Sequence, residues 1–165
     1  MKKITIGSIL FFTLLSFPSS AQDYRIENNE VKIIKEVKFK TGSAELLQES
    51  DEALLIIKKY LEDKSYISLL RVEAHNDNSG NEKDNQLLTE KRASAVCDRL
   101  VFLGADCMRL LPVGFGGTKP VADNSSPEGR SENRRINFVN ASLRGRAIGG
   151  MPADGGGKVV DNPCH

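Results

Sequence analysis

Two neighbouring stretches of the chain decide its fold: they read AHNDNSG at residues 74–80 and NQLLTEKRA at residues 85–93. The first consists of turn-forming residues and follows an apolar run over 65–74 that predicts a strand. The second lies in a segment whose apolar spacing predicts a helix, beginning within 81–84 and running to about Leu103. A strand, a polar loop and a helix in this order open a parallel β-α-β unit.

The elements on both sides of this unit complete the predicted fold. We expect a strand over Val31–Lys40, a helix from near Ala44, a strand over Leu110–Phe115, turns over Gly116–Arg130 and a last strand over Asn133–Ala141. The order is β-α-β-α-β-loop-β. It predicts the α/β class: a two-layer sandwich in which the helices cover one face of a small mixed sheet.

The start of the chain resembles a secretory signal peptide. Lys2 and Lys3 precede an apolar run that ends at Phe17, and small residues then predict cleavage after Ala21. A retained membrane anchor is the alternative, but the run is shorter than the roughly 20 apolar residues that span a bilayer. No second long apolar run follows, so we expect an exported protein without a transmembrane segment after cleavage.

The remaining chain divides into three parts. After the signal peptide at residues 1–21 we expect a short polar leader at 22–30, one domain at 31–142, and a flexible tail at 143–165 in which glycine is frequent. The 165 residues carry Lys+Arg 23 against Asp+Glu 22, a formal net charge of +1. Binding to nucleic acid or to an anionic membrane needs a field of one sign, so neither is expected.

Export bears on whether the three cysteines form disulfides. In an oxidising compartment we expect a disulfide between Cys97 and Cys107, which leaves Cys164 over, although three pairings are possible and two buried thiols are the alternative. A zinc site built from cysteines with His75 and His165 has no recognised ligand spacing. We therefore expect no metal and no cofactor.

The candidate binding site lies at the loop after the predicted inner strand. Asp77 stands just past the strand end, where sheets of this kind usually bind ligands. Arg92 lies about two turns into the following helix and leans back toward the loop, on the same face as Asn85. A carboxylate and a guanidinium that converge there suit a zwitterion, whose ammonium and carboxylate they would bind. The alternative is an internal Asp–Arg ion pair that only fixes the loop.

These stretches resemble the OmpA-like peptidoglycan-binding domain, shared with Pal-type lipoproteins and the periplasmic part of MotB. The family pattern is G-H-T-D-x-x-G followed by N-x-x-L-S-x-x-R-A, and the resemblance covers about Val37–Ala141. Ala74 and Asn76 depart from it, in place of glycine and threonine. Further matching blocks are GFG at 114–116, PVADN at 120–124, EGR at 128–130 and NRRI at 133–136.

The resemblance implies a ligand and a role. Asp77 and Arg92 match the residues that hold the D-centre of diaminopimelate in the peptidoglycan stem peptide, and Asn85 and Arg134 match further positions near the site. It implies a non-catalytic binder in a Gram-negative periplasm, free or associated with the outer membrane, that tethers itself or a partner complex to the wall. We expect a structural role for Arg135.

Two other functions are considered. A wall-cleaving enzyme would need a zinc triad or a marked pair of carboxylates, and the chain has two histidines and no such pair. We therefore expect no enzyme. The other alternative is a structural subunit of an envelope, secretion or motility complex that has lost ligand binding and works through protein contacts.

Overall fold

The computed structural model describes residues 23–148, 150, 155–161 and 163–164. The predicted signal peptide lies outside the described residues. The strands are β1 (Tyr24–Glu27), β2 (Glu30–Ile33), β3 (Ile67–Ala74), β4 (Leu110–Gly114), β5 (Ile136–Leu143), β6 (Arg146–Ala147) and β7 (Lys158–Val159). The helices are α1 (Asp51–Asp63), α2 (Glu82–Phe102) and α3 (Pro127–Asn133), with 3-10 turns η1 (Gln48–Ser50) and η2 (Cys107–Arg109).

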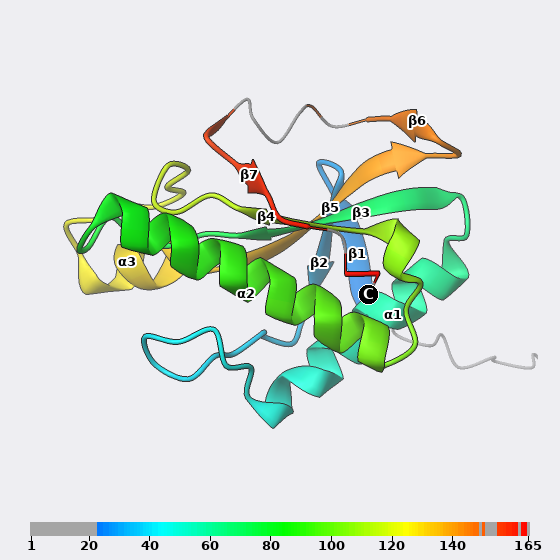
Figure 1. Cartoon of the computed structure of the whole chain (residues 1–165), viewed down its shortest axis with the longest axis horizontal. Helices are drawn as coiled ribbons and strands as arrows, with labels where there is room; N and C mark the ends of the chain where they lie inside the picture. The colour runs from blue at the N-terminus through cyan, green and yellow to red at the C-terminus, as the bar shows by residue number, and fades with distance from the viewer. Residues whose placement is uncertain (1–22, 149, 151–154, 162, 165) are drawn as a thin grey trace, which may run out of the picture.

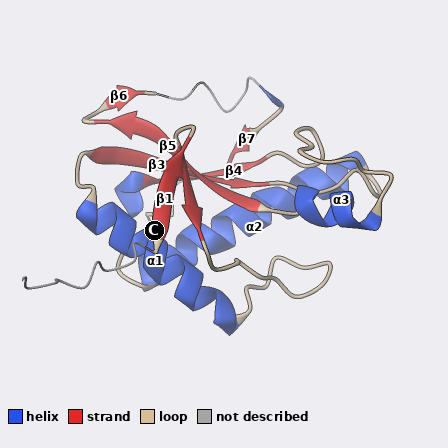
Figure 2. Ribbon diagram, turned by 180° about the vertical axis from the view of Figure 1, so that it is seen from behind, coloured by secondary structure: helices blue, strands red, loops and turns tan. Residues whose placement is uncertain are grey.

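The strands form one mixed sheet in the order β1-β2-β5-β3-β4-β7, with β6 paired to β5. The central strand β3 runs parallel to β4 and antiparallel to β5. Helices α1 and α2 lie on the same side of the sheet (Figures 1 and 2). The predicted α/β sandwich with helices on one face is confirmed.

The core lies between the sheet and the two long helices. Leu70 and Val72 of β3 are fully buried together with Ile57 of α1 and Leu100 of α2. Burying such a side chain contributes roughly 1.5–3 kcal/mol, so this layer fixes how the helices pack. Tyr60 donates from its hydroxyl to Asn140 Oδ1 at 2.7 Å, and burial raises the pKa of the Tyr60 phenol to about 12.

The N-terminal segment differs from the predicted leader and strand. It forms a β1–β2 hairpin whose two-residue turn is Asn28-Asn29, both with positive φ of 48° and 68°. Asparagine tolerates that conformation, which matches the twist of paired strands. Tyr24 packs the hairpin against α1: its ring contacts the ring of Tyr60 edge-on, with the ring centroids 5.0 Å apart. The predicted strand ends at Ile33 instead of Lys40.

Two helix predictions also change. The first helix begins at Asp51 rather than near Ala44, because the Ser43 hydroxyl accepts from the Glu45 amide within a loop instead of capping a helix. The segment expected to contain only turns ends in helix α3. Its N-cap is Ser126, which accepts from Gly129 N at 3.0 Å, and Pro127 follows at the first helical position. Strand β5 therefore starts at Ile136, after this helix.

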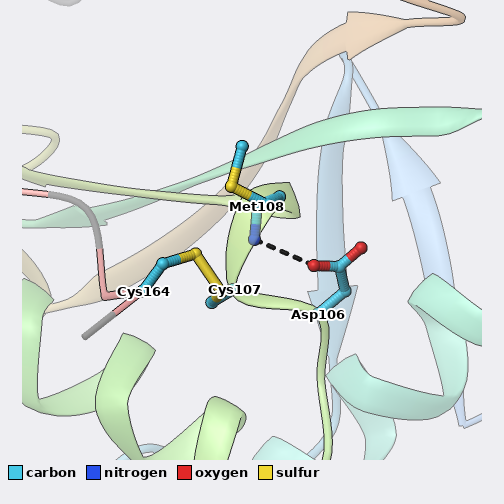
Figure 3. The surroundings of a disulfide bond; sticks show 4 residues. All are labelled: Asp106, Cys107, Met108 and Cys164. Atoms are coloured by element: carbon cyan, nitrogen blue, oxygen red, sulfur yellow. Dashed lines mark hydrogen bonds between the residues drawn. A yellow bond between two sulfur atoms is a disulfide. The ribbon is translucent and has the colours of Figure 1, made fainter.

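The predicted disulfide is wrong: Cys107 bonds to Cys164, and Cys97 is a free, buried cysteine (Figure 3). Cys97 lies on the face of α2 that packs into the core, where burial raises the pKa of its thiol. Cys107 stands beyond the end of α2, and its Cα lies 5.2 Å from that of Cys164, a normal bridging distance. The described part of the tail pairs with β4 and is pinned by the bridge at Cys164; a flexible tail was expected unless that cysteine formed a bridge.

Candidate functional site

The site is built on the loop that joins β3 to α2. The amide of Asn76 donates to Gly116 O at 2.7 Å, which ties the loop to the turn after β4. At the other end Asn81 caps α2, because its side-chain oxygen accepts from Lys83 N at 2.8 Å. Ala74, which replaces the motif glycine, lies inside β3 with no positive φ, so the backbone there does not require glycine.

Asp77 is held in place by two groups. Its Oδ1 accepts from Ser79 N at 2.9 Å, and its Oδ2 accepts from Arg134 Nη1 at 2.5 Å. The side chain of Asp77 is 8% exposed, and that of Arg134 is 44% exposed. Burial acts to raise the pKa of Asp77, but the hydrogen bonds from Arg134 and Ser79 outweigh it and hold that pKa below its ordinary value. Asp77 is therefore an anion paired with a half-exposed cation, Arg134.

Arg92 lies deeper and has different neighbours. Its Nε donates to Ser43 O at 2.9 Å, and its guanidinium carbon lies 5.0 Å from the centroid of the Phe39 ring. It makes no ion pair with any carboxylate of the described residues. Burial and then the charge of Arg134 lower the pKa of Arg92. Arg92 is therefore a partly buried cation with a second cation, Arg134, nearby.

The predicted residues do come together, but not in the predicted pairs. Arg92 and Arg134 line one small cavity of about 30 Å³, with Phe39 and His75 on its wall. Arg134 links this cavity to Asp77, because its Nη1 also donates to the Asp77 carboxylate. The carboxylate partner is therefore Arg134, where the spacing had suggested Arg92. The contributions of Phe39 and Ser43 were missed, since the loop that carries them was expected to be strand and helix cap.

Asn85 fastens the loop. Its side-chain nitrogen donates to Ser79 O at 2.8 Å, and its oxygen accepts from Asn76 Nδ2 at 2.7 Å. Asn76, the other departure from the family pattern, thereby supplies a contact within the loop. A second hollow of about 320 Å³ borders this region and is lined by Asn78, Gly80, Glu82, Asn85, Gly117 and Thr118.

His75 supports the site from below. Its ring stacks on Phe115 with centroids 4.9 Å apart, and its Nε2 lies 3.3 Å from Glu73 Oε2. Burial lowers the pKa of His75, so the neutral imidazole is favoured. Burial also acts to raise the pKa of Glu73, but His75 and Arg71 together hold it below its ordinary value. Arg135 donates to the carbonyls of Asn133 and Lys119, in keeping with the structural role expected of it.

The described residues were also considered for metal binding and for membrane-spanning helices. No group of three or more His, Cys, Asp or Glu side chains among them is placed to hold a metal ion. Within that same part of the chain, none of the helices has the length and apolar character needed to cross a bilayer.

Comparison with known proteins identifies what this site resembles. The OmpA family profile matches residues 38–134. The chain is 37% identical over 108 residues to outer membrane porin F of Pseudomonas aeruginosa, covering 64% of this chain and 30% of the porin. It is 40% identical over 68 residues to the peptidoglycan-binding protein ArfA of Mycobacterium tuberculosis, covering 41% of this chain and 21% of ArfA. The chain therefore spans less than a third of the length of either relative.

A solved structure gives the same result. The cell wall anchor of the T6SS from Pseudomonas aeruginosa superposes with a TM-score of 0.60 at 30% sequence identity, covering 74% of this chain and 90% of that one. The region that the OmpA family profile matches, residues 38–134, includes the strand–loop–helix unit that carries Asp77 and Arg92.

Proposed function

Because the chain belongs to the OmpA family, we propose that it binds peptidoglycan by holding the diaminopimelate residue of the stem peptide, and that it does so without cleaving the wall. By this proposal it acts in the periplasm, free or at the outer membrane, and tethers itself or a partner complex to the wall. The names of its relatives support this, since ArfA is called peptidoglycan-binding and the T6SS protein a cell wall anchor.

The observation that carries the proposal is the state of Arg92. A partly buried guanidinium without a carboxylate partner among the described residues has lost some of its hydration, and the Ser43 carbonyl and the Phe39 ring compensate only part of that cost. An incoming carboxylate would complete the site through charge-assisted hydrogen bonds. The cavity beside Arg92 is also lined by Arg134 and Arg135, so it carries an excess of positive charge that attracts an anion.

Asp77 supplies the complementary charge. In the proposed complex the ligand ammonium donates to Asp77, while Arg134, which is 44% exposed, turns from Asp77 toward the ligand carboxylate. The D-centre of diaminopimelate presents an ammonium and a carboxylate on one carbon. Asp77 and Arg92 bind those two groups, and Asn85 keeps the loop in shape.

The test is titration of the mature protein with a soluble muropeptide that carries diaminopimelate, beside pull-down on purified sacculi. Truncating one member of a buried charged contact costs on the order of 2 kcal/mol or more, so Arg92→Ala and Asp77→Asn should each weaken binding roughly 30-fold or more. The matched controls are Arg25→Ala and Asp98→Asn, which change exposed charges elsewhere and should bind as wild type does.

A muropeptide with lysine in place of diaminopimelate tests the ligand, because it lacks the second carboxylate. Equal affinity for the two muropeptides would contradict the stem-peptide assignment. Soluble fragments released from sacculi would contradict the non-catalytic role.

One observation favours the alternative of a structural subunit without ligand binding. Asp77 is already paired with Arg134, as expected of an ion pair that only fixes the loop. If Asp77→Asn and Arg92→Ala both retain sacculi as wild type does, the structural reading replaces the proposal.

A further inference from the structure

The C-terminal segment lies beside the site, outside the region matched by the family. We call residues 155–160 the strap. Its strand β7 pairs with β4 through Val159 with Val113 and Lys158 with Gly114, and Val160 N donates to Pro112 O at 3.0 Å. Figure 1 shows β7 beside β4. Beyond the strap, the Cys107–Cys164 bridge anchors the segment (Figure 3).

The strap contacts the turn at residues 116–119, which follows β4. The Thr118 hydroxyl lies 2.8 Å from Gly155 O and 2.7 Å from Phe115 O, so it links the strap to the end of β4. Gly156 has a positive φ of 78°, and a Cβ built on it would lie 3.1 Å from Thr118 Cγ2. The strap is thus packed against this turn with no room for a larger residue.

The same turn supports the loop that carries Asp77. Gly116 O accepts the amide of Asn76 at 2.7 Å, and Gly116 N donates to Thr89 Oγ1 at 2.8 Å. Gly117 lies so close that a Cβ on it would meet Asp77 O at 2.9 Å. Any shift of the turn therefore moves the backbone that positions Asp77.

We propose that the strap is a positioning element of the binding site: it braces the turn at 116–119, and the Cys107–Cys164 bridge keeps it there. This inference rests on the proposed function. Its physical basis is preorganisation, because a loop already held in its binding geometry loses less conformational freedom when ligand arrives. The strap contains none of the residues proposed to bind the ligand, so by this proposal it acts on binding through the Asn76–Asp77 backbone.

Two glycines allow a matched test. Gly156→Ala and Gly145→Ala both place a side chain at a left-handed φ, 78° and 77°, but only the Cβ at Gly156 meets Thr118, whereas Gly145 has nothing within 4 Å. We expect Gly156→Ala to weaken binding of the diaminopimelate muropeptide roughly three- to tenfold. It should also speed hydrogen exchange of the Asn76 amide. Gly145→Ala should change neither.

A second variant, Cys107→Ser/Cys164→Ser, releases the strap without adding bulk. It should show the same two changes while its circular dichroism spectrum keeps the folded signature. The inference is overturned if Gly156→Ala and the serine variant both bind and exchange as wild type does while Asp77→Asn loses binding; the proposed function then stands. If Asp77→Asn and Arg92→Ala bind as wild type does, the proposed function fails, and the inference fails with it.

Discussion

The β3–α2 unit and the C-terminal segment are held in place by different means. The β3–α2 unit is specified by its own local sequence: a continuous run of buried residues at the end of β3, the Asn81 cap and the apolar face of α2. The C-terminal segment owes its place to partners far away, namely β4 and a disulfide that spans 57 residues. The difference teaches that the proposed binding residues can lie on a unit defined by its local sequence. The segment proposed to brace them can have little regular structure of its own.

The largest effect is expected in the core under the first region. Leu70→Ala removes a fully buried side chain of β3 and leaves a cavity between the sheet and the helices. It should lower the free energy of unfolding by about 2–5 kcal/mol, measured by urea denaturation. Leu87→Ala is the control, because Leu87 is a half-exposed leucine of α2 and should cost far less. If both variants lost the same free energy of unfolding, Leu70 would not lie in the core as the structure places it.

The next effect concerns the second region. Cys107→Ser/Cys164→Ser opens a long loop and should lower the free energy of unfolding by roughly 2–4 kcal/mol under oxidising conditions. Cys97→Ala keeps the bridge and serves as the control. In the native wild-type protein a thiol reagent should label no cysteine until the chain unfolds, and then Cys97 alone. A non-reduced digest that links Cys97 to Cys107 would contradict this structure.

A smaller effect returns to the β3–α2 unit. Asn81→Ala removes the side-chain oxygen that accepts the amides of Lys83 and Asp84 at the start of α2. Loss of such a cap should cost about 1 kcal/mol in urea denaturation. Asn81→Asp keeps a capping oxygen and should restore most of the stability. A full loss in Asn81→Asp as well would show that the cap is not what stabilises this helix end.

The smallest effect is the pH dependence of Asp77, which lies in the loop of the β3–α2 unit. Its pKa is lowered in the folded state, so its contribution to stability is complete above the unfolded pKa of about 3.9 and is lost as the pH falls through the folded value. Wild type should therefore lose more stability than Asp77→Asn on acidification below about pH 4. Asp98→Asn should follow wild type. Parallel pH profiles of wild type and Asp77→Asn would contradict the lowered pKa.

Local patterns predicted the central elements well. Apolar residues placed β3, α2 and β4 within a few residues of their observed bounds, because the two strands bury most of their length and α2 buries one periodic face. The β1–β2 hairpin was missed because half of its strand residues are charged and only Tyr24 and Val31 are buried. The Asn28-Asn29 turn was the one signal that could have revealed it.

Contacts between residues far apart in the chain could not be predicted from the sequence. Spacing favoured Cys97 as the partner of Cys107, yet the face of α2 that Cys97 occupies points into the core. Likewise helix geometry brought Arg92 toward the loop but not to Asp77, which contacts Arg134, 57 residues away. Ser43 and Phe39, which hold Arg92, belong to a loop whose shape is set by tertiary contacts rather than by its own residues.

The Cys107–Cys164 bond has a consequence for proteolysis. It closes a covalent ring that contains β4, α3, β5 and the whole C-terminal segment. A single backbone cut anywhere within that ring leaves both pieces attached, so the nicked molecule keeps its mass on a non-reducing gel apart from one added water. The proposed attachment to the cell wall would thus survive a protease that opens an exposed turn such as Arg144-Gly145.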